Sequence, residues 1–463
     1  MDITESPVTA PAAESFSDLL EANSELDPTY VEVSATENLA RRQVSGAVIL
    51  TVTMLGVSAA NYLLNLVLAR FLSPAEFGDA NLAVNLVLAA AAAAATLQLL
   101  SAGNGATGDP AAVESRRRLM RWAWGIGAAL GVGMALGSGA LARTLNTSTP
   151  LMFVVIGIGL PVYLAQAVLR GALQGDLRLG RLATSYAVEA TARVGIALLT
   201  LALGFGVVGA AVAISLSFVA SALAARHKAT SSDPLVRAES ATEGDRESRT
   251  AAVSVAATVL LIGQVVIANG DVVLAKAVMA PAAAGAYAAA AIIGRALYFL
   301  SWSVVHSTFP IVARTTDPTE RQRALRRALA MVVSTCVVGV AGLALLGRQL
   351  APLLLGDGYA GAVGVLVPYA IATSLFAVAN LVACVDLASG RWLAPAALLV
   401  GAALQTILLV SFGATPMAMA KAQVGAMAVT AALVAIAHVR DQRRSRSQIQ
   451  PNPTPEISRG SRA

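Results

Sequence analysis

Long apolar segments alternate with short polar segments along most of the chain. Twelve apolar segments hold about 20 or more residues each, which is enough for an α-helix to cross the hydrocarbon layer of a membrane. The approximate segments are 44–69, 78–101, 119–141, 150–171, 182–203 and 206–226, then 251–275, 284–308, 327–347, 361–386, 392–413 and 417–438. This pattern predicts an all-α, polytopic membrane protein with about twelve transmembrane helices.

A repeated turn sequence divides these segments into two sets of six. LARFLSPAEFGDA at 68–80 and LAKAVMAPAAAGAYA at 274–288 share an opening Leu-Ala-Arg/Lys and a later proline and glycine. Each copy lies between the first and second apolar segments of its set, where the chain is expected to turn at one membrane face. The repeat predicts a duplicated unit, and hence two six-helix lobes related by an internal repeat.

The polar segments complete the predicted organisation. Residues 1–42 carry nine Asp and Glu against two Arg, which is typical of an acidic disordered tail. A polar linker at 227–250 separates an N-terminal lobe at 43–226 from a C-terminal lobe at 251–439. Residues 440–463 are rich in Arg, Ser, Gln and Pro and are expected to form a basic disordered tail.

Composition supports a membrane protein and argues against several other classes. Hydrophobic residues make up 56% of the chain and charged residues 13%, against about 25% charged in soluble domains. The net charge of +6 comes from Lys and Arg spread over many short loops, so no nucleic-acid-binding surface is predicted. The sequence holds no phosphate-binding loop, no metal-ligand spacing and no nucleophile beside a base, so it predicts neither an enzyme nor a cofactor or metal site.

The distribution of positive charge predicts the orientation. If the N-terminus is cytoplasmic, the regions on the cytoplasmic side, among them the one containing Arg170, hold 26 of the 33 Lys and Arg. The outer regions hold five, including Lys276, and the other two lie within helices. Cytoplasmic loops of membrane proteins carry such an excess, so both termini are expected to be cytoplasmic.

Three ionisable residues lie well inside apolar segments: Glu189 and Arg193 on the fifth, and Arg295 on the eighth. At about 1.5 Å per residue, each arginine lies roughly 16 Å from the start of its segment, near the middle of a bilayer. Charges are costly in hydrocarbon, so such residues usually face a water-filled cavity or a partner. Arg193 and Arg295 are therefore candidate substrate-binding residues. For Glu189 and Arg193, an i, i+4 ion pair that fixes helix packing is the structural alternative.

Further polar residues extend this candidate site. Asp271, near the end of the seventh segment, could bind a proton or Na⁺, pair with Arg295, or lie at the water interface. It is therefore, with Glu189, a candidate for ion coupling or ion pairing. Amides within the segments suit sugar hydroxyls because they hydrogen-bond without a net charge, although hydrogen bonds between helices explain each of them equally well. The candidate substrate-binding amides are Asn61, Asn65, Asn85 and Gln264.

Three stretches also carry a family resemblance. They are LARFLSPAEFG at 68–78, LRGALQGDLRLGRLATSYAVEATARVG at 169–195, and GDVVLAKAVMAPAAAGAYAAAAIIGRALYFL at 270–300 with FPIVAR at 309–314. These patterns resemble the oligosaccharide flippases of bacterial polysaccharide export, which are Wzx-like members of the multidrug/oligosaccharidyl-lipid/polysaccharide exporter superfamily. The resemblance covers nearly everything except the two tails.

The resemblance implies a transporter of the bacterial cytoplasmic membrane that flips a polyprenyl-diphosphate-linked oligosaccharide by alternating access, for cell-surface polysaccharide biosynthesis. Arg193 and Arg295 would attract the diphosphate or acidic sugars. H⁺ or Na⁺ would be candidate coupling ions, and a polysaccharide polymerase and glycosyltransferases would be candidate partners. Two alternatives stay open: an ion-coupled multidrug exporter, and a flippase of lipid-linked peptidoglycan precursors, whose relatives usually have fourteen helices.

Overall fold

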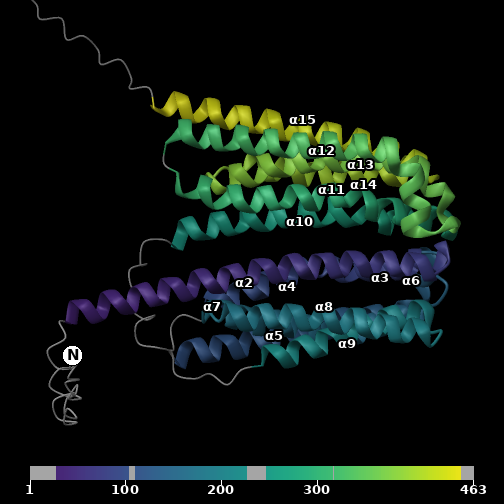
Figure 1. The fold of residues 1–463 in the computed structure, drawn as a ribbon, viewed down its shortest axis with the longest axis horizontal. Coiled ribbons are helices and arrows are strands. Elements are labelled where there is room, and N and C mark those ends of the chain that lie inside the picture. The colour runs from purple at the N-terminus through teal and green to yellow at the C-terminus, as the bar shows by residue number, and fades with distance from the viewer. Residues whose placement is uncertain (1–27, 104–109, 227–246, 316, 450–463) are drawn as a thin grey trace, which may run out of the picture.

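The computed structural model describes residues 28–103, 110–226, 247–315 and 317–449. Within these ranges the chain forms helices and no strand, and the helices gather into two bundles that lie side by side (Figure 1). The first bundle is the N-terminal lobe and the second is the C-terminal lobe. The fold is therefore all-α, with two lobes of membrane-spanning helices, as the segment pattern predicts.

The N-terminal lobe contains six spans, two of which are interrupted. The second span is broken at Ala90 and the third at Gly137, so the lobe holds eight helices. They are α2 (Pro28–Phe71), α3 (Pro74–Ala89), α4 (Ala91–Gly103), α5 (Pro110–Leu136), α6 (Ser138–Thr144), α7 (Leu151–Gly175), α8 (Leu179–Ala202) and α9 (Gly206–Ala225).

Within its described residues, the C-terminal lobe repeats this order with six helices and one short 3₁₀ turn. Its elements are α10 (Glu247–Val278), α11 (Pro281–Arg314), α12 (Pro318–Leu355), η3 (Asp357–Tyr359), α13 (Ala360–Ala388), α14 (Leu393–Phe412) and α15 (Pro416–Ile449). Pro161 in α7 and Pro368 in α13 occupy the same span of each lobe and lie inside their helices, where each removes a backbone hydrogen bond.

Eleven spans in the described part of the chain are long and apolar enough to cross a membrane. The predicted fifth segment, α8, is not among them, and the charged residues Glu189 and Arg193 in its middle lower its mean hydropathy. It nevertheless lies within the N-terminal lobe and packs along α9 and α2. The polar side chains of α8 are therefore held inside a membrane bundle, where they need partners.

The predicted boundaries differ from the structure at both tails. Helix α2 begins at Pro28, before the expected end of the N-terminal tail at 42, and α15 continues to Ile449, beyond the expected start of the C-terminal tail at 440. The remaining parts of the predicted tails and linker, at 1–27, 227–246 and 450–463, lie outside the described residues.

Close helix approach depends on glycine where α5 crosses α7. A Cβ added at Gly131 would lie 2.2 Å from the carbonyl oxygen of Gly157, and one at Gly157 would lie 2.7 Å from that of Gly131. These distances are too short for any side chain, so the two backbones touch directly. Such small-residue contacts are a common way for membrane helices to pack.

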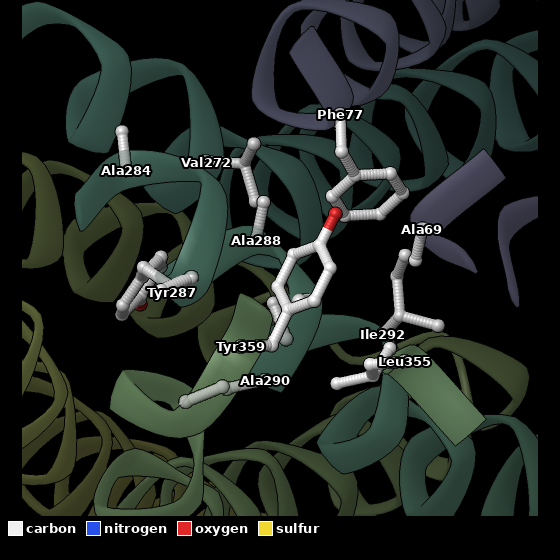
Figure 2. Close-up of a cluster of buried hydrophobic side chains, with 14 of the residues drawn as sticks. Ala69, Phe77, Val272, Ala284, Tyr287, Ala288, Ala290, Ile292, Leu355 and Tyr359 are labelled. Atoms are coloured by element: carbon white, nitrogen blue, oxygen red, sulfur yellow. The ribbon is translucent and has the colours of Figure 1, made fainter. Parts of the chain in front are cut away.

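The two lobes meet at one end of the molecule, where α2 turns into α3 and α10 turns into α11. We call this the turn end. Helix α3 of the N-terminal lobe packs against α10 and α11 there, and the ribbons of the lobes diverge toward the opposite end (Figure 1). One apolar cluster contains residues of both lobes, including Ala69 and Phe77 beside Ile292, Leu355 and Tyr359 (Figure 2). The lobes are thus closed against each other at the turn end.

Candidate functional site

An N-lobe cluster of three charged side chains lies between α7 and α8. Glu189 of α8 pairs with Arg193 one turn further along the same helix, and its other carboxylate oxygen lies 2.6 Å from Arg170 of α7. The three side chains are between 7% and 16% exposed. Gln166 also donates to Glu189, at 3.4 Å. Two guanidinium groups therefore share one carboxylate in the interior of a membrane bundle.

Arg193 connects this cluster to α9 and to α2, and α2 borders the other lobe. It donates through Nη1 to Asn61 of α2, at 3.2 Å, and through Nε to Ser217 of α9, at 3.3 Å. From Asn61 a chain of amides continues along α2 and α3: Asn65 donates to the Asn61 carbonyl oxygen, Asn81 to the Asn65 side chain, and Asn85 to Asn81. Three of the candidate amides are thus joined to Arg193.

A C-lobe cluster surrounds Asp271 of α10. Arg295 of α11 donates through Nη2 to Asp271 at 2.5 Å and through Nε to Tyr369 of α13 at 2.9 Å. Tyr369 and Tyr287 donate in turn to the other carboxylate oxygen of Asp271, at 2.7 and 3.3 Å. Side chains on a helix point toward its N-terminus, and α11 starts at the turn end, so Arg295 reaches back to Asp271. Asp271 itself is fully buried.

A small pocket lies beside Arg295 within the C-terminal lobe. Its lining also includes Tyr298, Thr373, Phe376 and Gln423. Thr373 donates to carbonyl oxygens of α11 and α13. The pocket is therefore bounded by aromatic rings and by side chains whose polar groups are already bonded within the lobe.

The formal charges of the two clusters differ. In the N-lobe cluster two arginines face one glutamate, so one positive charge is left over. In the C-lobe cluster Arg295 and Asp271 balance each other. Each guanidinium pairs with an acid of its own lobe. A buried charge without a matching partner is costly in a membrane, so the surplus in the N-terminal lobe favours a bound anion.

Gln264 lies apart from both clusters. It donates to the Asn380 side chain at 2.6 Å, between α10 and α13, and both residues are buried in the C-terminal lobe. This contact is a hydrogen bond between neighbouring helices, which is the structural alternative for an amide of this kind.

A buried ion pair joins the two lobes at the turn end. Nζ of Lys276 on α10 lies 2.6 Å from Oδ1 of Asp79 on α3, and the two side chains are 0% and 2% exposed. Ser148, in the loop between α6 and α7, donates to Asp79 through its backbone N–H at 2.8 Å and its hydroxyl at 2.7 Å. Lys276 also donates to the carbonyl oxygen of Asn146, at 3.1 Å. The pair is thus enclosed by both lobes.

The repeated turns themselves form the rest of this contact. Gly78 and Gly285, which match in the two copies, face each other, and a Cβ added at Gly285 would lie 1.6 Å from the carbonyl oxygen of Pro74. Beside them, the Phe77 ring packs edge-on against Tyr359 of the C-terminal lobe, with ring centres 5.9 Å apart. We call Asp79, Lys276, Gly78, Gly285, Phe77 and Tyr359 the interlobe contact.

Tyr359 also bonds across the lobes, because its hydroxyl donates to the Leu72 carbonyl oxygen at 3.3 Å. Burial raises the pKa of the Tyr359 hydroxyl well above its usual range, and the nearby Glu76 carboxylate raises it further. The phenol therefore stays a hydrogen-bond donor at alkaline pH. The loop that carries Tyr359 follows α12 and lies outside the spanning segments.

Sequence reasoning missed three charged residues of these sites. The charge count places Arg170 with the cytoplasmic-side regions, at the end of the predicted segment 150–171, and Lys276 with the outer regions. Both lie within helices and are buried. Asp79 was not singled out at all. The repeat offered a signal for Lys276, since the residue belongs to the repeated turn. No comparable signal in the sequence shows that Arg170, at the end of its predicted segment, is buried.

Comparisons with known proteins bear on the fold. No protein-family model and no curated protein matches the chain. Among solved structures, the chain is similar to a multidrug resistance MATE family transporter of the MOP superfamily in its inward-facing conformation, with a TM-score of 0.69 and 14% identity over 87% of this chain and 98% of that one. It is also similar to the lipid II flippase MurJ in an inward closed conformation, with a TM-score of 0.63 and 12% identity over 84% of this chain and 87% of that one.

An outward-facing structure of a MATE family transporter gives a lower TM-score of 0.50, with 15% identity over 88% of this chain and 97% of that one. At these identities the likeness concerns the fold. The chain therefore shares the two-lobed membrane fold of these transporters.

Proposed function

We propose that the chain is a transporter of the bacterial cytoplasmic membrane that flips a polyprenyl-diphosphate-linked oligosaccharide by alternating access, for cell-surface polysaccharide biosynthesis. The observation that carries this proposal is the surplus guanidinium charge of the N-lobe cluster at mid-depth in the bundle. A diphosphate is the anionic part of such a substrate, and it suits the fork of an arginine side chain.

The amides joined to Arg193 suit the neutral part of the substrate. Asn61, Asn65 and Asn85 belong to one hydrogen-bonded chain that starts at the guanidinium. Amide groups both donate and accept, as sugar hydroxyls do. In this proposal the diphosphate binds at Arg193, the first sugars contact these amides, and the polyprenyl tail stays in the lipid. Arg295 and Gln264 would then serve the C-terminal side of the pathway.

The lobe arrangement fits one state of the cycle. The distribution of positive charge over the loops supports an orientation in which the turn end faces outward. With the lobes closed there and diverging toward the opposite end, the structure corresponds to an inward-facing state, in keeping with the higher TM-score to an inward-facing transporter. Substrate would enter from the cytoplasmic side, where glycosyltransferases would supply it, and a polymerase would receive it outside.

An ion-coupled multidrug exporter is the second candidate, because MATE family transporters share the fold. Such a protein would use a free carboxylate at mid-depth to bind a cationic drug or its coupling ion. Here Glu189 is paired with two arginines and Asp271 with one. Asp271 would serve as a site for H⁺ or Na⁺ only when Arg295 moves away. A flippase of lipid-linked peptidoglycan precursors is the third candidate, since it too would bind a lipid diphosphate.

The test uses the full chain reconstituted in liposomes. A fluorescent polyprenyl-diphosphate oligosaccharide is placed in the membrane, and its headgroup becomes accessible to a sugar-modifying enzyme outside only after flipping. A second arm follows a cationic dye under an imposed ion gradient. We expect movement of the lipid-linked sugar and none of the dye. Dye movement without sugar movement would contradict the proposal and favour a multidrug exporter, and movement of a lipid-linked peptidoglycan precursor alone would favour the third candidate.

A further inference from the structure

Arg170 is the least exposed member of the N-lobe cluster and is held by bonds to two neighbouring helices. Its Nε donates to the Ser185 hydroxyl at 3.1 Å, and its Nη2 donates to the Ser185 carbonyl oxygen at 3.2 Å and to the Ser221 hydroxyl at 2.7 Å. The guanidinium also stacks on the Tyr186 ring, 3.8 Å from its centre. These contacts fix Arg170 between α7, α8 and α9, so it is unable to swing toward a substrate.

The only charged partner of this fixed guanidinium among the described residues is Glu189. The 2.6 Å contact holds one carboxylate oxygen of Glu189, while the other oxygen pairs with Arg193. The three residues thus form a row, with Arg170 at the buried end and Arg193 at the end that reaches α2. Helix α2, which Arg193 reaches through its bond to Asn61, borders α11 and α12 of the opposite lobe. Helix α9 contacts both ends of the row, through Ser221 at Arg170 and Ser217 at Arg193.

We propose that Arg170 is a positioning residue whose charge compensates Glu189, so that Arg193 keeps a net positive charge for an anionic substrate group. Without Arg170, Glu189 would neutralise Arg193 and its carboxylate would repel the anion. With Arg170 present, the row carries one net positive charge. Arg170 therefore sets anion affinity without touching the anion. This inference rests on the proposed function, because it takes Arg193 as the site of the diphosphate.

The size of the effect follows from the charge that is removed. One unit charge acting over roughly 6 Å at an effective dielectric constant of about 20 changes an affinity by about 100-fold, and screening by water would reduce this toward about 10-fold. The loss of Arg170 should weaken anion binding by a factor in this range. A purely structural role would predict a loss of folded protein instead, with no dependence on the charge of Glu189.

The test measures binding of inorganic pyrophosphate to the full chain in nanodiscs by calorimetry. The variants are Arg170→Gln, Arg170→Lys, Glu189→Gln and the double variant Arg170→Gln/Glu189→Gln, with folding checked by thermal unfolding. The formal charge summed over positions 170, 189 and 193 is +1 in wild type. It is 0 in Arg170→Gln, +1 in Arg170→Lys, +2 in Glu189→Gln and +1 in the double variant. We expect Arg170→Gln to bind about 10- to 100-fold more weakly, Glu189→Gln to bind more tightly, and Arg170→Lys and the double variant to bind like wild type.

Rescue by the double variant is the decisive outcome, because it restores the charge without restoring Arg170. If wild type binds pyrophosphate and the folded double variant binds as weakly as Arg170→Gln, charge compensation is wrong while the anion site stands. If Arg170→Gln binds like wild type, the inference is also wrong. If wild type itself does not bind pyrophosphate, the anion site of the proposed function fails, and this inference fails with it.

Discussion

Replacing Lys276 by methionine should open the turn end. Methionine keeps most of the length of the lysine side chain and removes its charge, so Asp79 loses its cation while staying in contact with Ser148. Both side chains of the pair are almost completely buried in the closed state. When the lobes separate at the turn end, water reaches Asp79, so the penalty for the unpaired carboxylate applies to the closed state alone.

The magnitude follows from that burial. Removing one partner of a buried ion pair typically costs about 3–5 kcal/mol. At about 1.4 kcal/mol per factor of ten, the ratio of closed to open molecules should fall by roughly 100-fold to 5,000-fold. If the ratio of closed to open molecules in wild type is smaller than this fold-change, the closed state becomes the minor state in Lys276→Met.

The assay measures the distance between two spin labels on opposite lobes. Thr144→Cys and Leu353→Cys place labels at exposed positions on α6 and α12 near the turn end, in a background where the buried Cys336 and Cys384 are replaced by alanine. We expect a short distance in wild type and a longer one in Lys276→Met. Lys421→Met is the matched control, because Lys421 is exposed and lies at the same end of the same lobe.

Unchanged distance distributions in Lys276→Met would refute the reasoning. They would mean that apolar packing and the close glycine approach hold the lobes together without the ion pair. A second variant makes the test specific to charge: Asp79→Asn combined with Lys276→Met leaves no unpaired ion and should recover much of the closed population. Failure of that double variant to recover would assign the opening to lost packing.

The same pair of labels tests two other parts of the interlobe contact. Gly285→Ala places a Cβ 1.6 Å from the Pro74 carbonyl oxygen, so it should prevent closure. Gly361→Ala is the control, because the nearest atom to its added Cβ is 3.9 Å away, and it should leave the distance between the labels unchanged. Equal label distances in both variants would contradict this. Tyr359→Phe removes the bond to the Leu72 carbonyl oxygen and should shift the equilibrium toward the open state by about 1 kcal/mol, a factor of about five. Because the pKa of Tyr359 is raised, the stabilisation of the closed state by its hydroxyl is complete below the usual tyrosine pKa and is lost only as pH rises through the higher folded pKa. Raising the pH of wild type to about 10 should therefore leave the distance between the labels unchanged. Opening at that pH would show that the hydroxyl titrates normally.

The sequence predicts the architecture well because hydropathy acts over whole segments. All six segments of each set correspond to helices in the structure, and the repeated turn lies where the lobes meet. The repeat also explains why Gly78 and Gly285 touch, since matching positions of two related lobes meet across the axis that relates them. The apolar pattern also predicts α8 as segment 182–203, and the charged residues within that segment point to the N-lobe cluster.

The pairing of charges was less accessible. Glu189 and Arg193 are one turn apart, so the sequence alone suggests their contact, and Asp271 was already a candidate partner for Arg295. Arg170 and Lys276 could not be placed, because their partners lie on other helices and their burial depends on how those helices pack. A charged residue near the end of an apolar segment is expected to be exposed at the membrane surface, although a neighbouring helix can bury it.

Flipping measured in liposomes with Arg193→Gln tests the central claim most directly. The initial rate at which a fluorescent polyprenyl-diphosphate oligosaccharide becomes accessible outside is compared in wild type, Arg193→Gln and Arg121→Gln, at equal amounts of folded protein. Arg121 is the matched control because its guanidinium is exposed and pairs with Glu114 at the surface. If Arg193 binds the diphosphate, Arg193→Gln should lose transport while Arg121→Gln keeps it. Equal rates in all three proteins would contradict a cationic substrate site in the N-terminal lobe.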